Sequence, residues 1–215
     1  MLKNDLITER FNTVANSYYS EIGPKAFYDG PRVLHDAFSS YFEMDSRKRD
    51  ILDLGCGTGL LGKHFKPYSN KLAGVDLSEA MLANAEELEV YDSLVIADIS
   101  TFCGSSAEVY DVVISNGVFQ YFQNLEELFI LISRVLQDNG YLVFNVDKNY
   151  VDSSDYRLSP EDAAGLVACH SHNYISRVAD LANFKVLKFG EYFDRSDWNS
   201  SDKKIVSMYH VMRKM

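Results

Sequence analysis

Three aspartates and a glycine-rich turn are the residues whose types and spacing could do chemistry. Three glycines alternate with other residues over positions 55–59, and Asp53 lies two residues before the first of them. Alternating glycines let the backbone turn tightly and bring its N–H groups close to a ligand. Asp76 and Asp98 each close a later apolar run. Carboxylates accept hydrogen bonds from ammonium and hydroxyl groups, so this set could hold a ligand that carries both.

The glycine turn fits three kinds of ligand loop. Gly57-x-Gly59-x-x-Gly62 matches a dinucleotide fingerprint, Gly57-x-x-x-x-Gly62-Lys63 matches most of a phosphate loop, and Asp53-x-Gly55-x-Gly57-x-Gly59 matches the loop that holds S-adenosylmethionine. A phosphate loop needs Ser or Thr after the lysine to contact magnesium, and here that residue is His64. Asp76 has about the spacing of a dinucleotide ribose contact. However, Asp53 would repel a pyrophosphate, whereas it can accept a hydrogen bond from the ammonium of S-adenosylmethionine.

These residues need a framework that brings them together. Short apolar runs predict buried parallel strands at 50–54, 71–76, 93–98, 111–115 and 141–146, and helical patterns lie at about 60–67, 78–89 and 125–136. Ser78 is a typical N-cap for the second helix, and Gly140 is expected to end the third. Strands alternating with helices predict a doubly wound α/β sheet, in which ligands bind beyond the carboxyl ends of the strands.

The remaining segments flank this sheet. Residues 1–49 show helical spacing at 11–19 and 33–42, and we expect an N-terminal helical segment packed against or across the ligand edge of a core that spans 50–215. Residues 149–172 show no clear periodicity, so an insertion or lid is predicted at about 149–175. A helix at 173–183 and strands at 185–193 and 204–212 complete the prediction.

Composition excludes several classes of function. The 215 residues carry a net charge of −10, which disfavours binding to a nucleic acid backbone. No apolar run approaches the roughly 18 residues of a membrane span. The three cysteines lack metal-ligand spacing, so we expect no metal and reduced thiols. The first ten residues lack the apolar stretch of a secretory signal, which favours a cytoplasmic location.

Several motifs in register resemble those of the class I S-adenosylmethionine-dependent methyltransferases. They are Leu52-Asp-Leu-Gly-Cys-Gly-Thr-Gly59, Gly74-Val-Asp-Leu-Ser-Glu-Ala-Met-Leu82, Ala97-Asp-Ile99, Tyr110-Asp-Val-Val-Ile-Ser115 and Arg134-Val-Leu-Gln-Asp-Asn-Gly-Tyr141. The resemblance implies a seven-stranded Rossmann-like sheet of order 3-2-1-4-5-7-6 with strand 7 antiparallel. Residues 168–174 resemble, more loosely, a small-molecule subgroup related to tetratricopeptide-repeat-associated methyltransferases.

Each polar part of the cofactor then has an expected partner. Asp53 would meet the ammonium, the glycine turn the carboxylate, Asp76 the ribose hydroxyls, and Asp98 with the N–H of Ile99 the adenine. Tyr18 or, preferably, Tyr19 would cover the methionine end, where an aromatic face favours the sulfonium charge. The full set of predicted cofactor contacts is Tyr19, Asp53, Gly55, Cys56, Gly57, Gly59, Asp76, Leu77, Met81, Asp98, Ile99, Ser115 and Asn116.

The expected reaction is transfer of a methyl group to a small molecule by in-line displacement, leaving S-adenosylhomocysteine. A sulfonium methyl is already activated, so alignment matters most and a general base is needed only for an acceptor such as a hydroxyl. Candidates for contact with the acceptor or for proton transfer are Gln120, His170 and His172. Two alternatives stay open: an NAD(P)-dependent oxidoreductase, and a non-catalytic module that binds S-adenosylmethionine.

Overall fold

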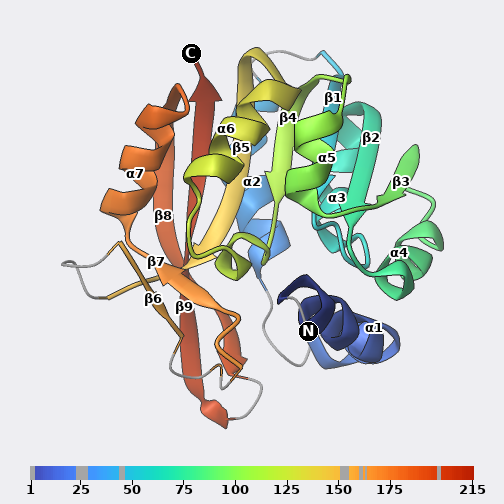
Figure 1. The fold of residues 1–215 in the computed structure, drawn as a ribbon. Helices are drawn as coiled ribbons and strands as arrows, with labels where there is room; N and C mark the ends of the chain where they lie inside the picture. The colour runs from blue at the N-terminus through green and yellow to red at the C-terminus, as the bar shows by residue number, and fades with distance from the viewer. Residues whose placement is uncertain are drawn as a thin grey trace.

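A seven-stranded sheet with helices on both faces organises the chain in a computed structural model (Figure 1). The structure describes residues 3–22, 29–43, 47–150, 155–159, 162, 164–197 and 200–215, without the side chains of 19–22, 43, 194–197 and 200–204. The strands are β1 (Arg49–Leu54), β2 (Ser69–Asp76), β3 (Ser93–Ile96), β4 (Tyr110–Ser115), β5 (Leu136–Asp147), β6 (Tyr156–Leu158), β7 (Ala168–His170), β8 (Phe184–Asp197) and β9 (Ser200–Lys214). The helices are α1 (Lys3–Ile22), α2 (Gly30–Glu43), α3 (Leu60–Phe65), η1 (Lys66–Tyr68), α4 (Glu79–Glu86), α5 (Ile99–Ser105), η2 (Phe119–Tyr121), α6 (Glu126–Val135) and α7 (His172–Leu181).

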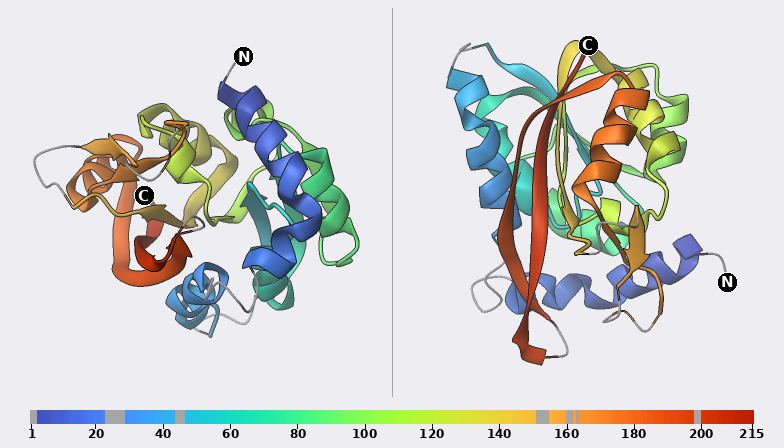
Figure 2. Two further views of the ribbon diagram at one scale, coloured as in Figure 1. Left: turned by 90° about the horizontal axis from the view of Figure 1, so that it is seen from below. Right: turned by 90° about the vertical axis from the view of Figure 1, so that its left-hand side faces the viewer.

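The strand order is β3-β2-β1-β4-β5-β9-β8, with β1 to β5 parallel and β9 antiparallel to both of its neighbours. Since β8 and β9 are the sixth and seventh strands of this sheet, the predicted order and the antiparallel seventh strand are confirmed. The β8–β9 hairpin is much longer than the other strand pairs and extends past the carboxyl ends of β1 to β5 (Figure 2).

Each face of the sheet has its own hydrophobic core, because successive strand residues point to opposite faces. In β1, Leu52 and Leu54 pack with side chains from α5, α6 and α7, whereas Ile51 packs with side chains from α2 and α3. Phe38 of α2 and Phe65 of α3 are fully buried on that second face. The two cores hold the strands in register, and this fixes where their carboxyl ends lie.

The two N-terminal helices take different positions. Helix α2 covers one face of the sheet, while α1 crosses the carboxyl ends of the strands (Figures 1 and 2). Asn12 and Asn84 tie α1 to α4: the Asn12 Oδ1 accepts a hydrogen bond from the Ser78 hydroxyl, and the Asn84 amide donates to the Ala15 carbonyl. The sequence left open whether the N-terminal segment packs against the sheet or crosses its ligand edge. In the structure α2 does the first and α1 does the second (Figure 1).

Three local features differ from the sequence prediction. The segment at 149–175 contains the two-stranded sheet of β6 and β7, and α5 was not predicted. Helix α6 ends at Val135 without the expected glycine cap, and the left-handed residue is Asn139 (φ 65°). Gly140 serves close packing instead, because a Cβ there would lie 2.8 Å from the carbonyl oxygen of Gln137 and 3.0 Å from that of Asp111.

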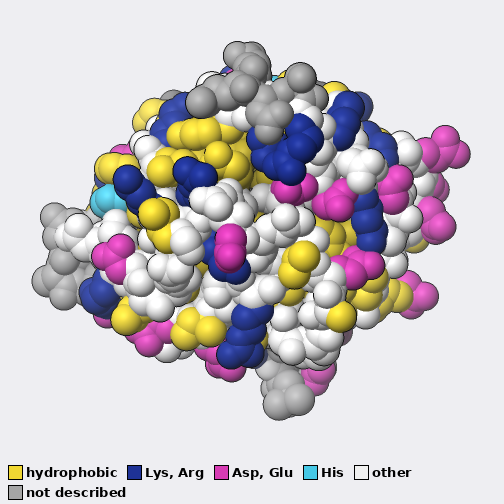
Figure 3. Space-filling model, turned by 90° about the horizontal axis from the view of Figure 1, so that it is seen from above, with side chains coloured by type: hydrophobic (Ala, Val, Ile, Leu, Met, Phe, Trp, Pro, Cys, Tyr) yellow, Lys and Arg dark blue, Asp and Glu magenta, His cyan; other side chains and the backbone are white. Residues whose placement is uncertain are grey.

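Charged side chains of both signs lie on the edge of the sheet opposite the carboxyl ends of β1 to β5. On this edge, basic side chains lie beside acidic ones (Figure 3), including Lys71 with Glu108 at 2.7 Å and Lys214 with Asp138 at 3.2 Å. Among the described residues, no helix has the length and apolarity that crossing a membrane requires. The same part of the chain contains no group of three or more potential metal ligands.

Candidate functional site

A cavity of about 420 Å³ lies at the carboxyl ends of the strands, beneath α1. Its walls come from the glycine turn, the ends of β2 and β4, the start of α5, and one side of α1. Ile7 and Phe11 of α1 supply apolar cover on the side opposite the strands. Loop residues therefore form the floor and a helix forms the roof.

Asp76 lies in this cavity with both carboxylate oxygens held by the backbone. Its Oδ2 accepts from the N–H of Gly57 at 2.8 Å, and its Oδ1 accepts from the N–H of Ser78 at 2.9 Å. Burial raises the pKa of Asp76, and these backbone donors act against that rise. A carboxylate has about four lone-pair sites. Each oxygen therefore retains capacity for a hydroxyl group in the cavity.

The glycine turn has the conformation that its sequence predicts. Gly55, Gly57 and Gly59 all have positive φ, between 53° and 86°. At Gly55 a Cβ would also lie 2.3 Å from a methyl group of Val118. A side chain is therefore disfavoured by conformation at each of these three glycines and, at Gly55, also by space.

A second, smaller cavity of about 30 Å³ lies beside the first and shares Tyr18, Gly55, Gly57 and Asn116 with it. Asp53 and Thr58 also line it, and both are almost fully buried. Asp53 Oδ1 and Thr58 Oγ1 have no hydrogen-bond partner among the described residues. Buried polar atoms without partners are costly, which points to a ligand that completes them.

The electrostatics of Asp53 are unusual. Its Oδ2 accepts a hydrogen bond from the Tyr91 hydroxyl at 2.8 Å, and Asp53 is only 1% exposed. Burial raises its pKa to about 7; the nearby Asp76 adds to the rise and the Tyr91 hydrogen bond opposes it. Asp53 is therefore poised to ionise when a cation enters the small cavity.

Asp98 caps α5 and contacts α1. Its Oδ1 accepts from the N–H of Thr101 at 2.9 Å, and its Oδ2 accepts from the side-chain amide of Asn4 at 3.2 Å. The carboxylate therefore has a structural role and also faces the main cavity. Leu77, Met81 and Ile99 line the same cavity.

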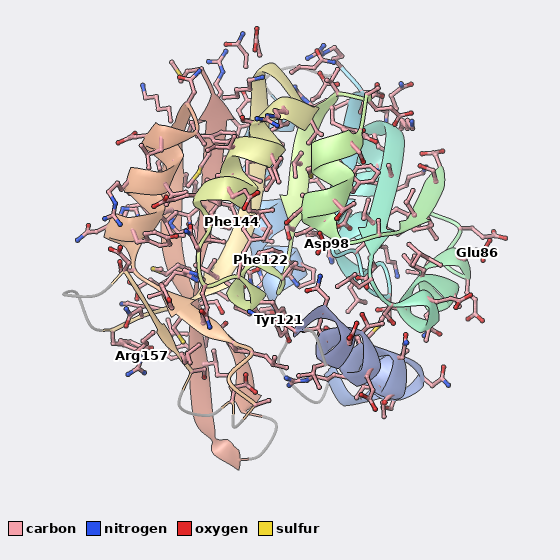
Figure 4. The ribbon with its side chains drawn as sticks, in the orientation of Figure 1. Glu86, Asp98, Tyr121, Phe122, Phe144 and Arg157 are labelled. Atoms are coloured by element: carbon pink, nitrogen blue, oxygen red, sulfur yellow. The ribbon has the colours of Figure 1, made fainter. Side chains whose placement is uncertain are left out.

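The roof and the loop after β4 meet at Tyr121. The rings of Phe11 and Tyr121 pack edge to face at 5.7 Å, and the Lys3 ammonium donates to the Tyr121 carbonyl. Figure 4 shows Tyr121 next to the end of α1, with Phe122 farther from that helix and Asp98 at the start of α5. Tyr121, Phe122 and Asn116 therefore line the cavity on the side of the loop after β4.

Three predicted cofactor contacts, Gly59, Ser115 and Tyr19, are not among the described residues that line the two cavities. Ser115 is buried and its hydroxyl donates to the Leu54 carbonyl at 2.8 Å, and Gly59 forms the N-cap of α3; neither lines the two cavities. Cys56 lines the small cavity, but burial raises the pKa of its thiol well above the ordinary value. Tyr19 belongs to α1, and its side chain lies outside the described residues. Tyr18 lines both cavities.

The three candidates for acceptor contact or proton transfer are not brought together. Gln120 is 4% exposed and is not among the residues that line the two cavities. His170 is fully buried, stacks on Tyr174, and has its pKa lowered to about 4 by burial. His172 lies 3.2 Å from His210 between ring nitrogens, at the start of α7. Their proposed roles stay predictions.

Sequence reasoning missed several residues of the site. Thr58 lies between two glycines of the turn, and its residue type alone does not predict a ligand contact. Lys3 and Asn4 come from α1, and only the tertiary packing of that helix places them at the cavity. Tyr91 follows α4 without any motif, and its contact with Asp53 spans 38 residues. Of these, only Thr58 carried a local signal, since it lies within the glycine turn.

Comparison with known proteins agrees with this geometry. Residues 52–144 match the family model described as "Methyltransferase domain". A malonyl-(acyl-carrier protein) O-methyltransferase from Bacillus cereus is 29% identical over 151 residues, which cover 67% of this chain and 54% of that protein. The chain thus spans about half the length of the curated relatives it matches.

Solved structures show the same fold. Magnesium protoporphyrin IX methyltransferase from Synechocystis, crystallised with bound S-adenosylhomocysteine, superposes with a TM-score of 0.75 over 100% of both chains at 16% identity. The cyclase SpnF superposes with a TM-score of 0.74 over 97% of this chain and 94% of its own at 14% identity. Because one of these proteins is a methyltransferase and the other a cyclase, the fold alone does not decide the reaction.

Proposed function

Since residues 52–144 belong to the methyltransferase domain family and the chain has the class I S-adenosylmethionine-dependent methyltransferase fold, we propose that the protein transfers a methyl group from S-adenosylmethionine to a small-molecule acceptor. One observation carries the proposal. Asp53 Oδ1 and Thr58 Oγ1, two buried polar atoms without described partners, line one small cavity that adjoins the larger cavity of Asp76.

The residues present fit each part of this cofactor. Asp53 would accept from the ammonium, while the Thr58 hydroxyl and the glycine-turn amides would meet the carboxylate. The free lone pairs of Asp76 suit the ribose hydroxyls, and Met81 with Ile99 offers apolar cover for the adenine ring. The larger cavity also has roughly the volume that a ligand of this size needs.

The same residues argue against a nicotinamide dinucleotide. A pyrophosphate at the glycine turn would lie beside Asp53, which no described cation contacts, and the two negative groups would repel each other. In the dinucleotide fingerprint the third glycine allows close packing of helix and strand. Here the space beside Gly62 holds the Tyr91 hydroxyl, which would lie 2.2 Å from a Cβ at Gly62.

The contribution of this chain to the reaction is positioning. When bound, S-adenosylmethionine supplies a methyl group already activated by a sulfonium. Helix α1 covers the cavity on the side opposite the strands, and the backbone donors on Asp76 fix the carboxylate before any ligand arrives. Alignment of this kind is worth roughly 7–11 kcal/mol of barrier in favourable cases. Asn116 and Tyr121 lie where an acceptor would meet the methyl group.

The proposal is tested by ligand binding and turnover. Calorimetry should detect S-adenosylmethionine and S-adenosylhomocysteine but not NAD, and Asp76→Ala should abolish the binding. Incubation with S-adenosylmethionine and a panel of small acids, alcohols and amines should then release S-adenosylhomocysteine, as measured by mass spectrometry. Preference for NAD would contradict the proposal. Binding without turnover by any acceptor would favour a non-catalytic module.

A further inference from the structure

The side chain of Tyr91 holds the Asp53 carboxylate from one side only. The hydroxyl donates to Oδ2 at 2.8 Å. Oδ1, on the same carboxylate, has no described partner, and Asp53 lines the small cavity together with Thr58. One oxygen is therefore fixed by the protein, and the other is left for a ligand.

Three glycines make room for the tyrosine ring. A Cβ at Gly62 would lie 2.2 Å from the Tyr91 hydroxyl oxygen, one at Gly59 would lie 3.1 Å from a ring carbon, and one at Gly74 would lie 3.0 Å from a ring carbon. These glycines come from the turn before α3, from α3 itself and from β2. Because three separate elements lack a side chain around one ring, the position of this tyrosine depends on all three glycines.

We propose that Tyr91 is a positioning residue for cofactor binding: its hydroxyl holds one oxygen of Asp53 so that the other faces the ammonium of the ligand. The inference rests on the proposed function, since it needs a ligand with an ammonium in the small cavity. It adds a residue that no motif of the glycine turn contains.

The charges around Asp53 give this arrangement a pH dependence. The groups that face the carboxylate are the Tyr91 hydroxyl, the Gly62 backbone N–H, the Asp76 carboxylate and the Cys56 thiol, and none of them is a cation. Burial and Asp76 raise the pKa of Asp53 to about 7, while the Tyr91 hydrogen bond lowers it. The ammonium binds the ionised carboxylate, so affinity falls below pH 7 by up to about tenfold per pH unit. Removing the Tyr91 hydroxyl should raise the pKa of Asp53, so that the loss of affinity begins at a higher pH.

The experiment compares two ligands that differ at the ammonium. S-Adenosylhomocysteine carries the amino acid group, whereas 5′-methylthioadenosine keeps the adenosine and the thioether without it. Dissociation constants for both are measured by calorimetry at pH 6, 7 and 8 for the wild-type protein and Tyr91→Phe. Tyr68→Phe is the control. Tyr68 packs, like Tyr91, against the core on the face of the sheet that α2 and α3 cover, but its ring is stacked on Phe42 away from Asp53. At each pH the dissociation constant of the variant is divided by that of the wild-type protein, so that the titration of the ligand itself cancels.

For S-adenosylhomocysteine and Tyr91→Phe, we expect the ratio of dissociation constants to be largest at pH 6 and to shrink toward pH 8. The ratio should stay near one for methylthioadenosine with Tyr91→Phe and for both ligands with Tyr68→Phe. A loss that is equal at every pH and shared by both ligands would mean that Tyr91 only supports packing, and would overturn the inference. Unchanged affinity in Tyr91→Phe would overturn it as well. If the wild-type protein binds neither adenosyl ligand, the proposed function itself fails.

Discussion

The Ser78 hydroxyl donates a hydrogen bond of 2.6 Å to Asn12 and accepts one of 3.1 Å from the backbone N–H of Met81. Ser78 is thus the N-cap of α4 and also one of the points at which α1 is attached to the sheet's ligand edge. Met81 lines the main cavity from below, and α1 covers it from above. A single hydroxyl therefore joins the floor of the cavity to its roof.

Loss of the Asn12 side chain should loosen the roof. In Asn12→Ala the Ser78 hydroxyl loses its acceptor, at a cost of about 1 kcal/mol for one hydrogen bond. If α1 closes over the cofactor, the dissociation constant for S-adenosylhomocysteine should rise about fivefold, as measured by calorimetry. Asn16→Ala is the matched control, because Asn16 is an exposed asparagine of the same helix. An equal effect in both variants would show that only helix propensity had changed.

The buried carboxylate of Asp53 should lower the stability of the empty protein, although it serves ligand binding. Its folded pKa of about 7 lies above the ordinary value of 3.8, so the empty protein loses stability as pH rises from about 4 to 7. Asp53→Asn removes that charge and keeps an acceptor for Tyr91. We expect the empty variant to be more stable than wild type by at least about 1 kcal/mol at pH 8 and by little at pH 3.5. Urea unfolding at both pH values measures this.

The same variant should bind the cofactor poorly. A neutral amide replaces the carboxylate that the ammonium needs, so affinity for S-adenosylmethionine should fall at least about tenfold. Greater stability together with weaker binding would identify Asp53 as a functional residue. Lower stability of the empty variant at pH 8 would contradict the assignment of a raised pKa.

Asp92 should respond to pH in the opposite direction. It accepts hydrogen bonds from the Leu72 backbone N–H and from the Lys66 ammonium, and these lower its pKa. A lowered pKa contributes stability above pH 4 that is lost as pH falls through the folded pKa. Asp92→Asn should therefore lower the urea midpoint at pH 7 and have little effect at pH 3. Because 44% of the side chain is exposed, the effect at pH 7 should be small.

Local patterns predicted the strands themselves, whereas the order of the strands was implied by the resemblance to the class I methyltransferases. Apolar runs locate β1, β2 and β4, and carboxylates at the ends of parallel strands must meet at one edge. The roles of Ser115 and Tyr91 could not be predicted in this way. Ser115 ends a strand like the aspartates, but its hydroxyl is satisfied by the neighbouring strand at Leu54. Tyr91 lies in a loop, and only the folded chain brings it to Asp53.

Asn139 and Gly140 show a further limit of local reasoning. A glycine after a helical pattern predicts a left-handed cap. The structure uses Asn139 for the positive φ and keeps Gly140 for its lack of a side chain, beside the carbonyl of Asp111 on β4. The sequence pattern correctly indicated that glycine is needed at position 140, but the reason for that need is the close approach of the neighbouring strand β4 and not a left-handed conformation.

Gly62 provides the last prediction, because it lies in a helix where alanine would ordinarily be favoured. Gly62→Ala should gain from helix propensity by up to about 1 kcal/mol, yet its Cβ would lie 2.2 Å from the Tyr91 hydroxyl and 2.5 Å from the ring carbon beside it. The ring must therefore move, and the hydrogen bond to Asp53 is lost. We expect lower stability in urea and weaker binding of S-adenosylhomocysteine. Gly104→Ala in α5 is the control, since the nearest side-chain atom is 3.6 Å away. That variant should keep or slightly increase stability and leave binding unchanged, whereas a neutral Gly62→Ala would show that Tyr91 is free to move without cost.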